Sequence, residues 1–379
     1  MTNALKAIWD RGQSVWIDTL HRGLVRDGGD LSRLIETDGL RGLTSNPSIF
    51  EKAIDGPDYT EALHHPDLEG LAPKAIYERI AVQDIQDAAD RFAPLYRSSD
   101  RRDGYVSLEV SPVLAHATQG TLDEARRLWH TVARKNLMIK VPATPEGIVA
   151  LEQLIGEGIN VNVTLLFAQP IYEQVAAAYQ GGLESLARHG GDLSHVASVA
   201  SFFISRIDEA MDTIVGVQLK ETKSMRTEVM LCSLFGNVAI SSAKRTYQKY
   251  LEIIHDDRWR HLSHQGAQTQ RLLWASTGMK NPNYRDVLYV EALIGKDTVN
   301  TMPPATLNAF RAHGKVRDSL TAQVGEAGRI MNFVDQVGIP FSEITDRLLV
   351  DGIHKFEDAF ASLLRKVALL RNDGHAKSA

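Results

Sequence analysis

The sequence predicts an α/β protein built as a single (β/α)8 barrel with additional N-terminal, inserted and C-terminal helices. Eight short apolar, β-branched segments alternate with longer helical segments along the 379 residues. Alternation of this kind predicts parallel βα units, and eight such units fit a closed barrel. Small polar or ionisable residues end seven of the eight predicted strands. A doubly wound open sheet is the alternative, because one sequence does not give the order of strands.

The predicted strands are short, and helices precede and separate them. The strands are expected at residues 14–19, 39–44, 105–110, 137–141, 160–167, 196–203, 272–277 and 298–303. The helices are expected at 1–13, 21–36, 48–97, 121–135, 145–156, 168–188 and 207–251, with a short helix after the seventh strand and a helical region from about 317. The additional helices extend the chain beyond the usual ~250 residues of such a barrel.

Nothing in the composition divides the chain into separate units. It contains no Gly/Ser-rich linker, no fixed-period repeat and no low-complexity tract. We therefore predict one barrel domain over residues 1–379, with 317–370 as a C-terminal helical extension packed on the barrel. The end of this extension, residues 353–370, has an amphipathic pattern.

Composition and charge exclude several classes of protein. The net charge of -5 gives no basic surface for nucleic acid or an anionic membrane. No stretch approaches the roughly 18 uncharged apolar residues of a membrane span, and the N-terminus lacks a signal-type apolar segment. We therefore predict no nucleic-acid partner, no membrane partner and a cytoplasmic location. The single cysteine, Cys232, excludes an intramolecular disulfide, and its apolar surroundings at 229–232 predict a small core residue.

Motifs for other kinds of catalysis are absent. The sequence has no G-x-G-x-x-G, Walker A, H-E-x-x-H or G-x-S-x-G motif. His255, His261 and His264 lie near Asp256 and Asp257, but in a charged helical region typical of a solvated surface. We therefore predict no metal site at these histidines.

One charged residue interrupts an otherwise apolar predicted strand. Lys140 lies within 137–141, where every other residue is apolar, and Pro142 follows. A lysine at a strand end can extend its ammonium to solvent, which is the simpler interpretation. Alternatively, a buried lysine is more readily neutral, and a neutral amine is a nucleophile for carbonyl carbon.

The other strand ends favour the second interpretation. In a barrel of this type, the C-terminal ends of the strands form the active site. Each polar residue there has a simple alternative role as a helix cap, a turn former or a partner of a surface arginine. Their coincidence on one predicted face is harder to explain structurally, because buried polar groups cost free energy unless they are paired. The residues concerned are Asp18, Thr44, Ser45, Asn46, Glu109, Lys140, Asn162, Thr164, Ser201 and Ser276.

Four motifs resemble the transaldolase family, and more narrowly its longer-chain bacterial branch. They lie at residues 42–50, 108–112, 139–144 and 159–167, and the match spans roughly residues 14–303 in the same order. The resemblance implies a single (β/α)8 TIM barrel with Schiff-base chemistry and neither metal nor cofactor. It also implies transfer of a three-carbon dihydroxyacetone unit between sugar phosphates in the pentose phosphate pathway.

The resemblance also implies a role for each matched residue. Lys140 corresponds to the Schiff-base lysine, and Asp18 to the base that takes the proton from the C4 hydroxyl. Glu109 and the Thr164 hydroxyl correspond to the pair that holds the water used in imine chemistry. The substrate-binding positions are Thr44, Asn46, Asn162, Ser201, Phe203, Arg206 and Ser276, with Arg206 corresponding to the family's phosphate-binding arginine.

The sequence departs from the family pattern at the phosphate end. In the best-known branch an arginine follows the seventh-strand serine by two positions, but here Gly278 follows Ser276 at that offset. Lys280 or Arg285 is expected to make the second phosphate contact. Two other functions stay open: a Schiff-base aldolase that releases free dihydroxyacetone, and a non-catalytic barrel that binds sugar phosphates. The sequence leaves open whether the protein is a monomer or a homodimer.

Overall fold

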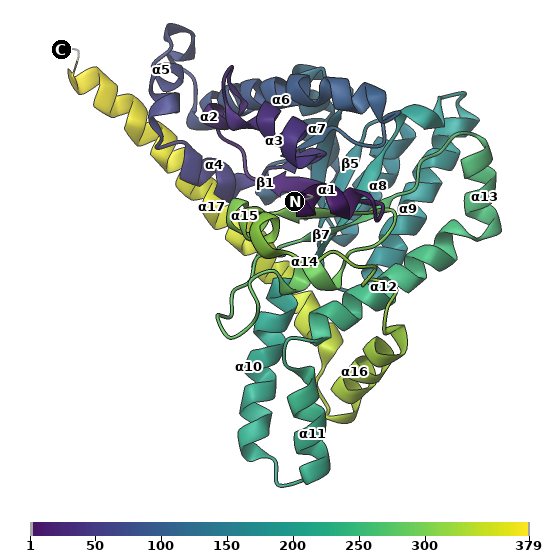
Figure 1. Ribbon diagram of the computed structural model, residues 1–379. Coiled ribbons are helices and arrows are strands. Elements are labelled where there is room, and N and C mark those ends of the chain that lie inside the picture. Colours follow the sequence, from purple (N-terminus) through teal and green to yellow (C-terminus); the bar gives the residue numbers. More distant parts are fainter. Residues whose placement is uncertain (1–2, 378–379) are drawn as a thin grey trace.

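Eight parallel strands close into a barrel in chain order (Figure 1). The computed structural model describes residues 3–377 and the side chains of residues 3–371. The strands are β1 (Gln13–Asp18), β2 (Gly42–Thr44), β3 (Tyr105–Glu109), β4 (Leu137–Pro142), β5 (Val161–Leu166), β6 (Ser198–Phe203), β7 (Arg271–Ala275) and β8 (Thr298–Met302). The predicted (β/α)8 barrel is confirmed. The doubly wound alternative is wrong, because β8 pairs with β1 and leaves the sheet no open edge.

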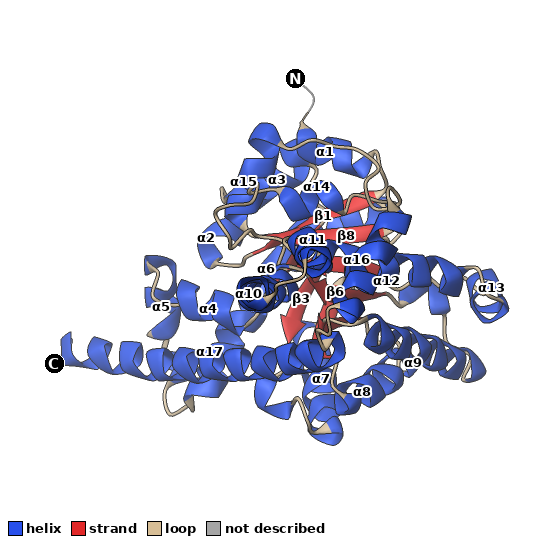
Figure 2. Cartoon of the chain, turned by 90° about the horizontal axis from the view of Figure 1, so that it is seen from below, coloured by secondary structure: helices blue, strands red, loops and turns tan. Residues whose placement is uncertain are grey.

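Helices surround the strands on all sides of the barrel (Figure 2). They are α1 (Ala4–Trp9), α2 (Arg22–Val25), α3 (Asp30–Asp38), α4 (Pro47–Ala53), α5 (Thr60–Leu63), α6 (Pro73–Ser98), α7 (Thr118–Val132), α8 (Pro145–Gly156), α9 (Gln169–Arg188), α10 (Ser205–Glu221), α11 (Met225–Leu234), α12 (Val238–Ile254), α13 (Asp257–His264), α14 (Leu288–Ala292), α15 (Pro304–His313), α16 (Val324–Gln336) and α17 (Phe341–Lys377). Among the helices described over residues 3–377, none has both the length and the apolar character to cross a membrane.

Two long helical regions predicted from the sequence are interrupted. The region 48–97 is divided into α4, α5 and α6, because prolines and glycines between residues 56 and 73 begin and end the short helices. The region 207–251 is divided into α10, α11 and α12, with Ser224 capping α11 and Gly236 adopting φ +65° before α12. Helix α15 was not predicted, although Pro304 at its first position is a typical helix start.

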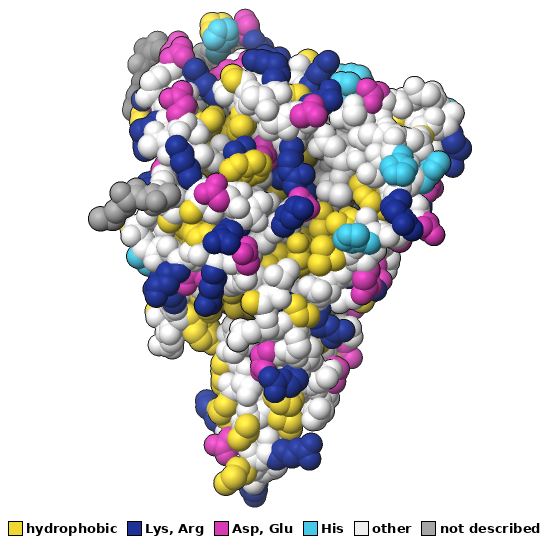
Figure 3. Space-filling view, turned by 45° about the vertical axis from the view of Figure 1, so that its right-hand side comes forward, with side chains coloured by type: hydrophobic (Ala, Val, Ile, Leu, Met, Phe, Trp, Pro, Cys, Tyr) yellow, Lys and Arg dark blue, Asp and Glu magenta, His cyan; other side chains and the backbone are white. Residues whose placement is uncertain are grey.

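Helices α10 and α11 project from the barrel as a hairpin, labelled at the bottom of Figure 1. Cys232 on α11 is exposed, so its predicted place in the core is wrong. Met225 and Val229 on the same helix are 80% and 61% exposed, and yellow apolar side chains mark this projection in Figure 3. Only Met230 and Leu231 of the apolar run are buried, because α11 packs on α10 and α16 with one face alone.

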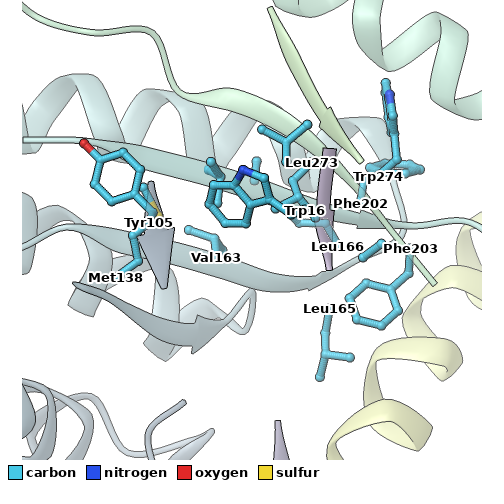
Figure 4. Packing of buried hydrophobic residues seen from close by; sticks show 14 of the residues in the cluster. Trp16, Tyr105, Met138, Val163, Leu165, Leu166, Phe202, Phe203, Leu273 and Trp274 are labelled. Carbon is cyan, nitrogen blue, oxygen red and sulfur yellow. The ribbon is translucent and has the colours of Figure 1, made fainter. Parts of the chain in front are cut away.

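Aliphatic and large aromatic side chains together fill the core around the strands (Figure 4). Trp16, Phe202 and Trp274 are fully buried, and the rings of Phe202 and Trp274 meet edge to face at 6.3 Å. A Cβ atom at Gly42 would lie 2.4 Å from the Trp16 ring. Glycine at the start of β2 therefore gives the indole its space beside the backbone of the next strand.

The C-terminal helix α17 runs along one side of the molecule (Figure 2). It packs against α4, α6 and β5. Lys366 donates to the backbone oxygen of Glu51 at 3.0 Å and to the carboxylate of Asp55 at 2.7 Å. At Gly352 a Cβ atom would lie 2.9 Å from the Leu165 side chain and 3.2 Å from the Arg206 guanidinium. The small residue therefore lets α17 approach the C-terminal end of the barrel.

A buried ionic cluster lies at the opposite, N-terminal end of the barrel. The Asp103 side chain is fully buried and accepts a hydrogen bond from Ser14 at 2.7 Å. The guanidinium groups of Arg271 and Arg41 each lie 3.2 Å from the same carboxylate. One buried carboxylate therefore balances the positive charges of two arginines, Arg41 just before β2 and Arg271 at the start of β7.

We predict that Asp103→Ala lowers the free energy of unfolding by about 3–5 kcal/mol, because removing one member of a buried ionic group leaves the others uncompensated. Urea denaturation followed by circular dichroism measures this change. Glu157→Ala, which removes the partner of Arg126 in a partly exposed pair, is the matched control and should cost about 1 kcal/mol or less. Equal losses in the two variants would contradict a special role for the buried cluster.

Candidate active site

The register of three adjacent strands brings three predicted site residues to one level of the barrel. Glu109 at the end of β3 pairs with Lys140 of β4, and Lys140 pairs with Asn162 of β5. In the same way, the pairing register of β1 with β2 places Asp18 beside Thr44. Parallel strands with matched ends therefore place these side chains around one end of the barrel, where such folds carry their active sites.

Lys140 is buried, so the simpler expectation of a lysine reaching solvent is wrong. The residue is 4% exposed, and the apolar residues on either side of it in β4 are buried too. Its Nζ donates to the backbone oxygen of Ser45 at 3.0 Å and lies 3.3 Å from the Glu109 carboxylate. The amine is therefore held in one position by a neutral acceptor and a carboxylate.

Asp18 is the second acid near the lysine. Its carboxylate accepts a hydrogen bond from the Thr44 hydroxyl at 2.7 Å, and Thr44 in turn lies 2.7 Å from the hydroxyl of Thr301 on β8. Burial raises the pKa of Asp18 above its ordinary value, while the charges of Lys140 and Arg206 and the Thr44 bond oppose this rise. Among the described residues, none forms a salt bridge with the Asp18 carboxylate, whose basicity is increased.

Glu109 lies beside the lysine but behind the main cavity. Burial raises the pKa of Glu109, and the nearby charge of Lys140 opposes the rise. Its side chain borders two small crevices, one of them shared with Tyr77 and the other with Phe356. The carboxylates of Asp18 and Glu109 thus lie at different positions near Lys140. This arrangement suits two separate proton transfers.

A cavity of about 750 Å³ opens over these strand ends. It brings together ten of the twelve site residues expected from the sequence. These are Asp18, Thr44, Asn46, Lys140, Thr164, Ser201, Phe203, Arg206, Ser276 and Lys280. Glu109 and Asn162 are not among the residues that line it. The cavity is large enough for a phosphorylated sugar, which small-molecule sites of about 300–1,000 Å³ accommodate.

The two asparagines already have partners within the protein. The Asn162 side chain is fully buried, donates to Ser107 at 3.1 Å and accepts from Ser201 at 2.7 Å. The Asn46 Oδ1 caps α4 by accepting from the backbone N–H of Ile49 at 3.0 Å. The Asn162 side chain therefore lies behind the cavity wall and binds Ser201, which lines the cavity. Asn46 lines the cavity directly.

A local irregularity in β5 frees the Thr164 hydroxyl. The pairing of β5 with β6 shifts between Val163 and Leu166, and Leu165 adopts φ +61°. This left-handed conformation is unfavourable for leucine and is often retained at functional sites. The Thr164 Oγ1 lines the cavity side, is buried and has no hydrogen-bond partner in the described part of the chain. A water or substrate hydroxyl is the natural partner for this atom.

Arg206 also lines the cavity. Its guanidinium lies 5.1 Å from the Phe203 ring and 5.9 Å from the Phe356 ring, and its Nη1 is buried without a partner among the described residues. Burial lowers the pKa of Arg206, and the carboxylates of Glu209, Glu109 and Asp18 oppose this. A buried guanidinium with a free N–H suits an oxyanion such as phosphate.

Of the two candidates for the second phosphate contact, only Lys280 lines the cavity. Arg285 instead binds the Glu291 carboxylate at 2.9 Å and the backbone oxygen of His313 at 2.9 Å. The geometry therefore favours Lys280, together with Ser276, as the group that replaces the missing arginine.

Phe356 of α17 is a cavity residue that the sequence did not reveal. Its ring centroid lies 5.9 Å from the Lys140 Nζ. In Figure 4 the neighbouring Phe203 and Leu165 lie on the side that faces α17. Lys52 of α4 also lines the cavity. No local signal distinguishes these two residues from other members of amphipathic helices. Within the described residues, no group of three His, Cys, Asp or Glu side chains is placed to hold a metal ion.

Comparison with known proteins agrees with this arrangement. The family model described as transaldolase/fructose-6-phosphate aldolase matches residues 15–367. The chain is 46% identical to "Transaldolase 2" of Nostoc punctiforme and 45% identical to the transaldolase of Trichodesmium erythraeum, with 97% of each chain covered. It is 44% identical to the transaldolase of Thiobacillus denitrificans over 96% of this chain and 99% of that protein. With its closed barrel and its buried lysine between two acids, the chain belongs to the transaldolase/fructose-6-phosphate aldolase family, as an enzyme of the transaldolase type.

Proposed function

We propose that the protein transfers a dihydroxyacetone unit from a ketose phosphate to an aldose phosphate through a Schiff base on Lys140. The donor is sedoheptulose 7-phosphate or fructose 6-phosphate, and the acceptor is glyceraldehyde 3-phosphate or erythrose 4-phosphate. This reaction belongs to the non-oxidative pentose phosphate pathway and needs neither metal nor cofactor. A cytoplasmic location and a monomeric or homodimeric state stay predictions.

The observation that carries this proposal is the position of the Lys140 amine. It is almost fully buried, it lines the cavity, and a carboxylate lies 3.3 Å away. An amine can form an imine only after losing a proton, and the neighbouring carboxylate can accept it. The imine then needs a proton source for the departing water. Glu109 lies 3.3 Å from the amine, and the Thr164 hydroxyl, unpaired among the described residues, lines the same cavity and would hold that water.

The carbon–carbon bond breaks in the second stage. Asp18 takes the proton from the C4 hydroxyl, the C3–C4 bonding electrons move toward the protonated imine, and the aldose phosphate leaves as an aldehyde. The protonated imine is the electron sink, and the remaining three carbons stay on Lys140 as an enamine. The raised pKa of Asp18 makes it a stronger base than an ordinary aspartate.

The enamine must survive until an acceptor aldehyde arrives. Phe203 and Phe356 supply apolar surface beside the cavity, where a hydroxyl group would instead hold water for hydrolysis. This apolar surface favours transfer over the alternative aldolase activity, which would release free dihydroxyacetone. A non-catalytic barrel is the less favoured alternative, because it would gain nothing from keeping Lys140, Asp18 and Glu109 buried together.

We expect Lys140→Ala to abolish both turnover and covalent trapping, because it removes the amine that lies beside Glu109 and forms the proposed imine. The measurement is borohydride reduction in the presence of fructose 6-phosphate, followed by peptide mapping. Lys244→Ala is the matched control, since Lys244 is also buried but lies outside the cavity and donates to the backbone oxygen of Ala322. Label on a lysine other than Lys140, or unchanged turnover in Lys140→Ala, would reject the mechanism.

We expect Asp18→Ala to slow cleavage by a factor on the order of 10²–10⁴ while imine formation persists, because the base acts only after the imine exists. Asp18→Asn should behave in the same way, since an amide keeps the shape but cannot take the proton. Stopped-flow turnover and borohydride trapping separate the two steps. Loss of the trapped adduct in both variants would show that Asp18 acts earlier than proposed.

The acid limb of the pH–rate profile should lie above the ordinary range of an aspartate, about 3.9. Asp18 must be ionised to act as a base, so activity is lost as pH falls through its raised pKa. The profile of kcat/KM against pH measures this limb, and its midpoint belongs jointly to Asp18 and Glu109 because their charges interact. If Asp18→Asn and Glu109→Gln both keep the wild-type limb, neither carboxylate is responsible.

A further inference from the structure

One face of α10 ties the barrel to the loop that follows β7. Ser205, Asp208 and Asp212 lie on this face, at spacings of three and four residues that stack side chains along a helix. Each has a partner between residues 276 and 289, which include the Lys280 loop. Arg206 lies on the same helix, so α10 connects the two sides of the proposed phosphate site.

Asp212 binds two separate segments. Its Oδ2 accepts a hydrogen bond from the Tyr284 hydroxyl at 2.7 Å, and its Oδ1 accepts one from the backbone N–H of Gly236 at 3.1 Å. A Cβ atom at Gly236 would lie 3.0 Å from the Tyr284 ring. Tyr284 is therefore held by its hydroxyl and by packing of its ring against the turn between α11 and α12.

Asp208 repeats the same pattern one helical turn earlier. Its Oδ2 accepts from the Tyr289 hydroxyl at 3.0 Å, and its Oδ1 accepts from the backbone N–H of Ala239 at 2.8 Å. Burial raises the pKa values of both tyrosines well above the ordinary value, and the carboxylates add to this effect, so both hydroxyls keep the protons that they donate.

The segment that carries Lys280 is anchored on both sides. Before it, the Ser276 hydroxyl lies 2.8 Å from that of Ser205, and Thr277 donates to the Asn300 side chain at 3.0 Å. After it, Tyr284 binds Asp212. Residues 278–283 thus form a short span with Lys280 inside it.

Lys280 also borders a second cavity of about 360 Å³, on the side away from Lys140. Asp208, Glu209 and Asp212 line this second cavity, as do both tyrosines. An ammonium close to several carboxylates is attracted toward them. The tyrosine hydroxyls already occupy one oxygen of Asp208 and one of Asp212, which reduces the capacity of this cavity to draw Lys280 away from the active site.

We propose that Asp208, Asp212, Tyr284 and Tyr289 form a clamp that positions Lys280 toward the active-site cavity and thereby sets the affinity for the substrate phosphate. This inference rests on the proposed transfer of sugar phosphates. The four residues touch neither the reacting carbons nor Lys140, so they are positioning residues. Removing one tyrosine hydroxyl frees a carboxylate oxygen for Lys280 and loosens the span 278–283.

The test uses Tyr284→Phe and two acceptors, glyceraldehyde 3-phosphate and unphosphorylated glyceraldehyde, with saturating sedoheptulose 7-phosphate as donor. We expect KM for the phosphorylated acceptor to rise about 5- to 20-fold, because one hydrogen bond to a charged group is lost. The kcat should change less than about twofold, as it does when uniform binding is removed. The kcat/KM for glyceraldehyde should also change less than about twofold.

Tyr247→Phe is the matched control, because it removes a tyrosine hydroxyl that donates to the backbone oxygen of Lys296 at 2.9 Å, away from this site. It should leave both acceptors unaffected. Lys280→Ala and the double variant Lys280→Ala/Tyr284→Phe complete a cycle. If the clamp acts through Lys280, the double variant should be no worse than Lys280→Ala alone.

Two results would overturn the clamp while leaving the proposed function intact. One is an equal loss for both acceptors, which would indicate general destabilisation. The other is additivity of Lys280→Ala and Tyr284→Phe, which would show that the tyrosine does not act through the lysine. A wild-type protein that transfers no dihydroxyacetone would instead overturn the proposed function, and the role of the clamp with it.

Discussion

The contact between Lys140 and Glu109 inside the barrel is the constraint on which the site depends. Two charged groups removed from water are costly unless each has a partner, and their mutual distance of 3.3 Å meets that need. The pair exists because adjacent parallel strands bring residues 109 and 140 to the same level. Asp18 and Arg206 line the cavity beside this pair, and their charges interact with it.

The polar ends of the barrel are separated by an apolar core, and they serve different purposes. At the N-terminal end, the Asp103 carboxylate pairs with Arg41 and Arg271 and stabilises the closed sheet. At the C-terminal end, polar groups such as the Thr164 hydroxyl and the Arg206 Nη1 are buried without partners among the described residues. Buried polar groups without partners cost free energy, so a fold keeps them only where other interactions hold the structure in place. Such groups are typical of binding sites.

Helices outside the barrel complete the site. Helix α17 reaches the cavity from the C-terminal part of the chain and contributes Phe356, with Gly352 allowing the close approach. Helix α10 carries Arg206 on one face and holds the loop after β7 with another. The barrel therefore positions Lys140 and the two acids, whereas these two helices contribute Arg206 and the apolar wall of the cavity.

The sequence by itself determined the barrel and the centre of its site. Strand ends in a parallel barrel converge by geometry, so the pattern that ends strands on Asp18, Glu109 and Lys140 was sufficient to predict their proximity. The breaks in the helical regions 48–97 and 207–251 follow local prolines, glycines and a serine cap, whereas the exposure of Cys232 and the cavity position of Phe356 could not be predicted from the sequence. Periodicity shows which face of a helix is apolar, but not which neighbour covers that face. That choice depends on how helices far apart in sequence cross in space, and only the tertiary structure decided it.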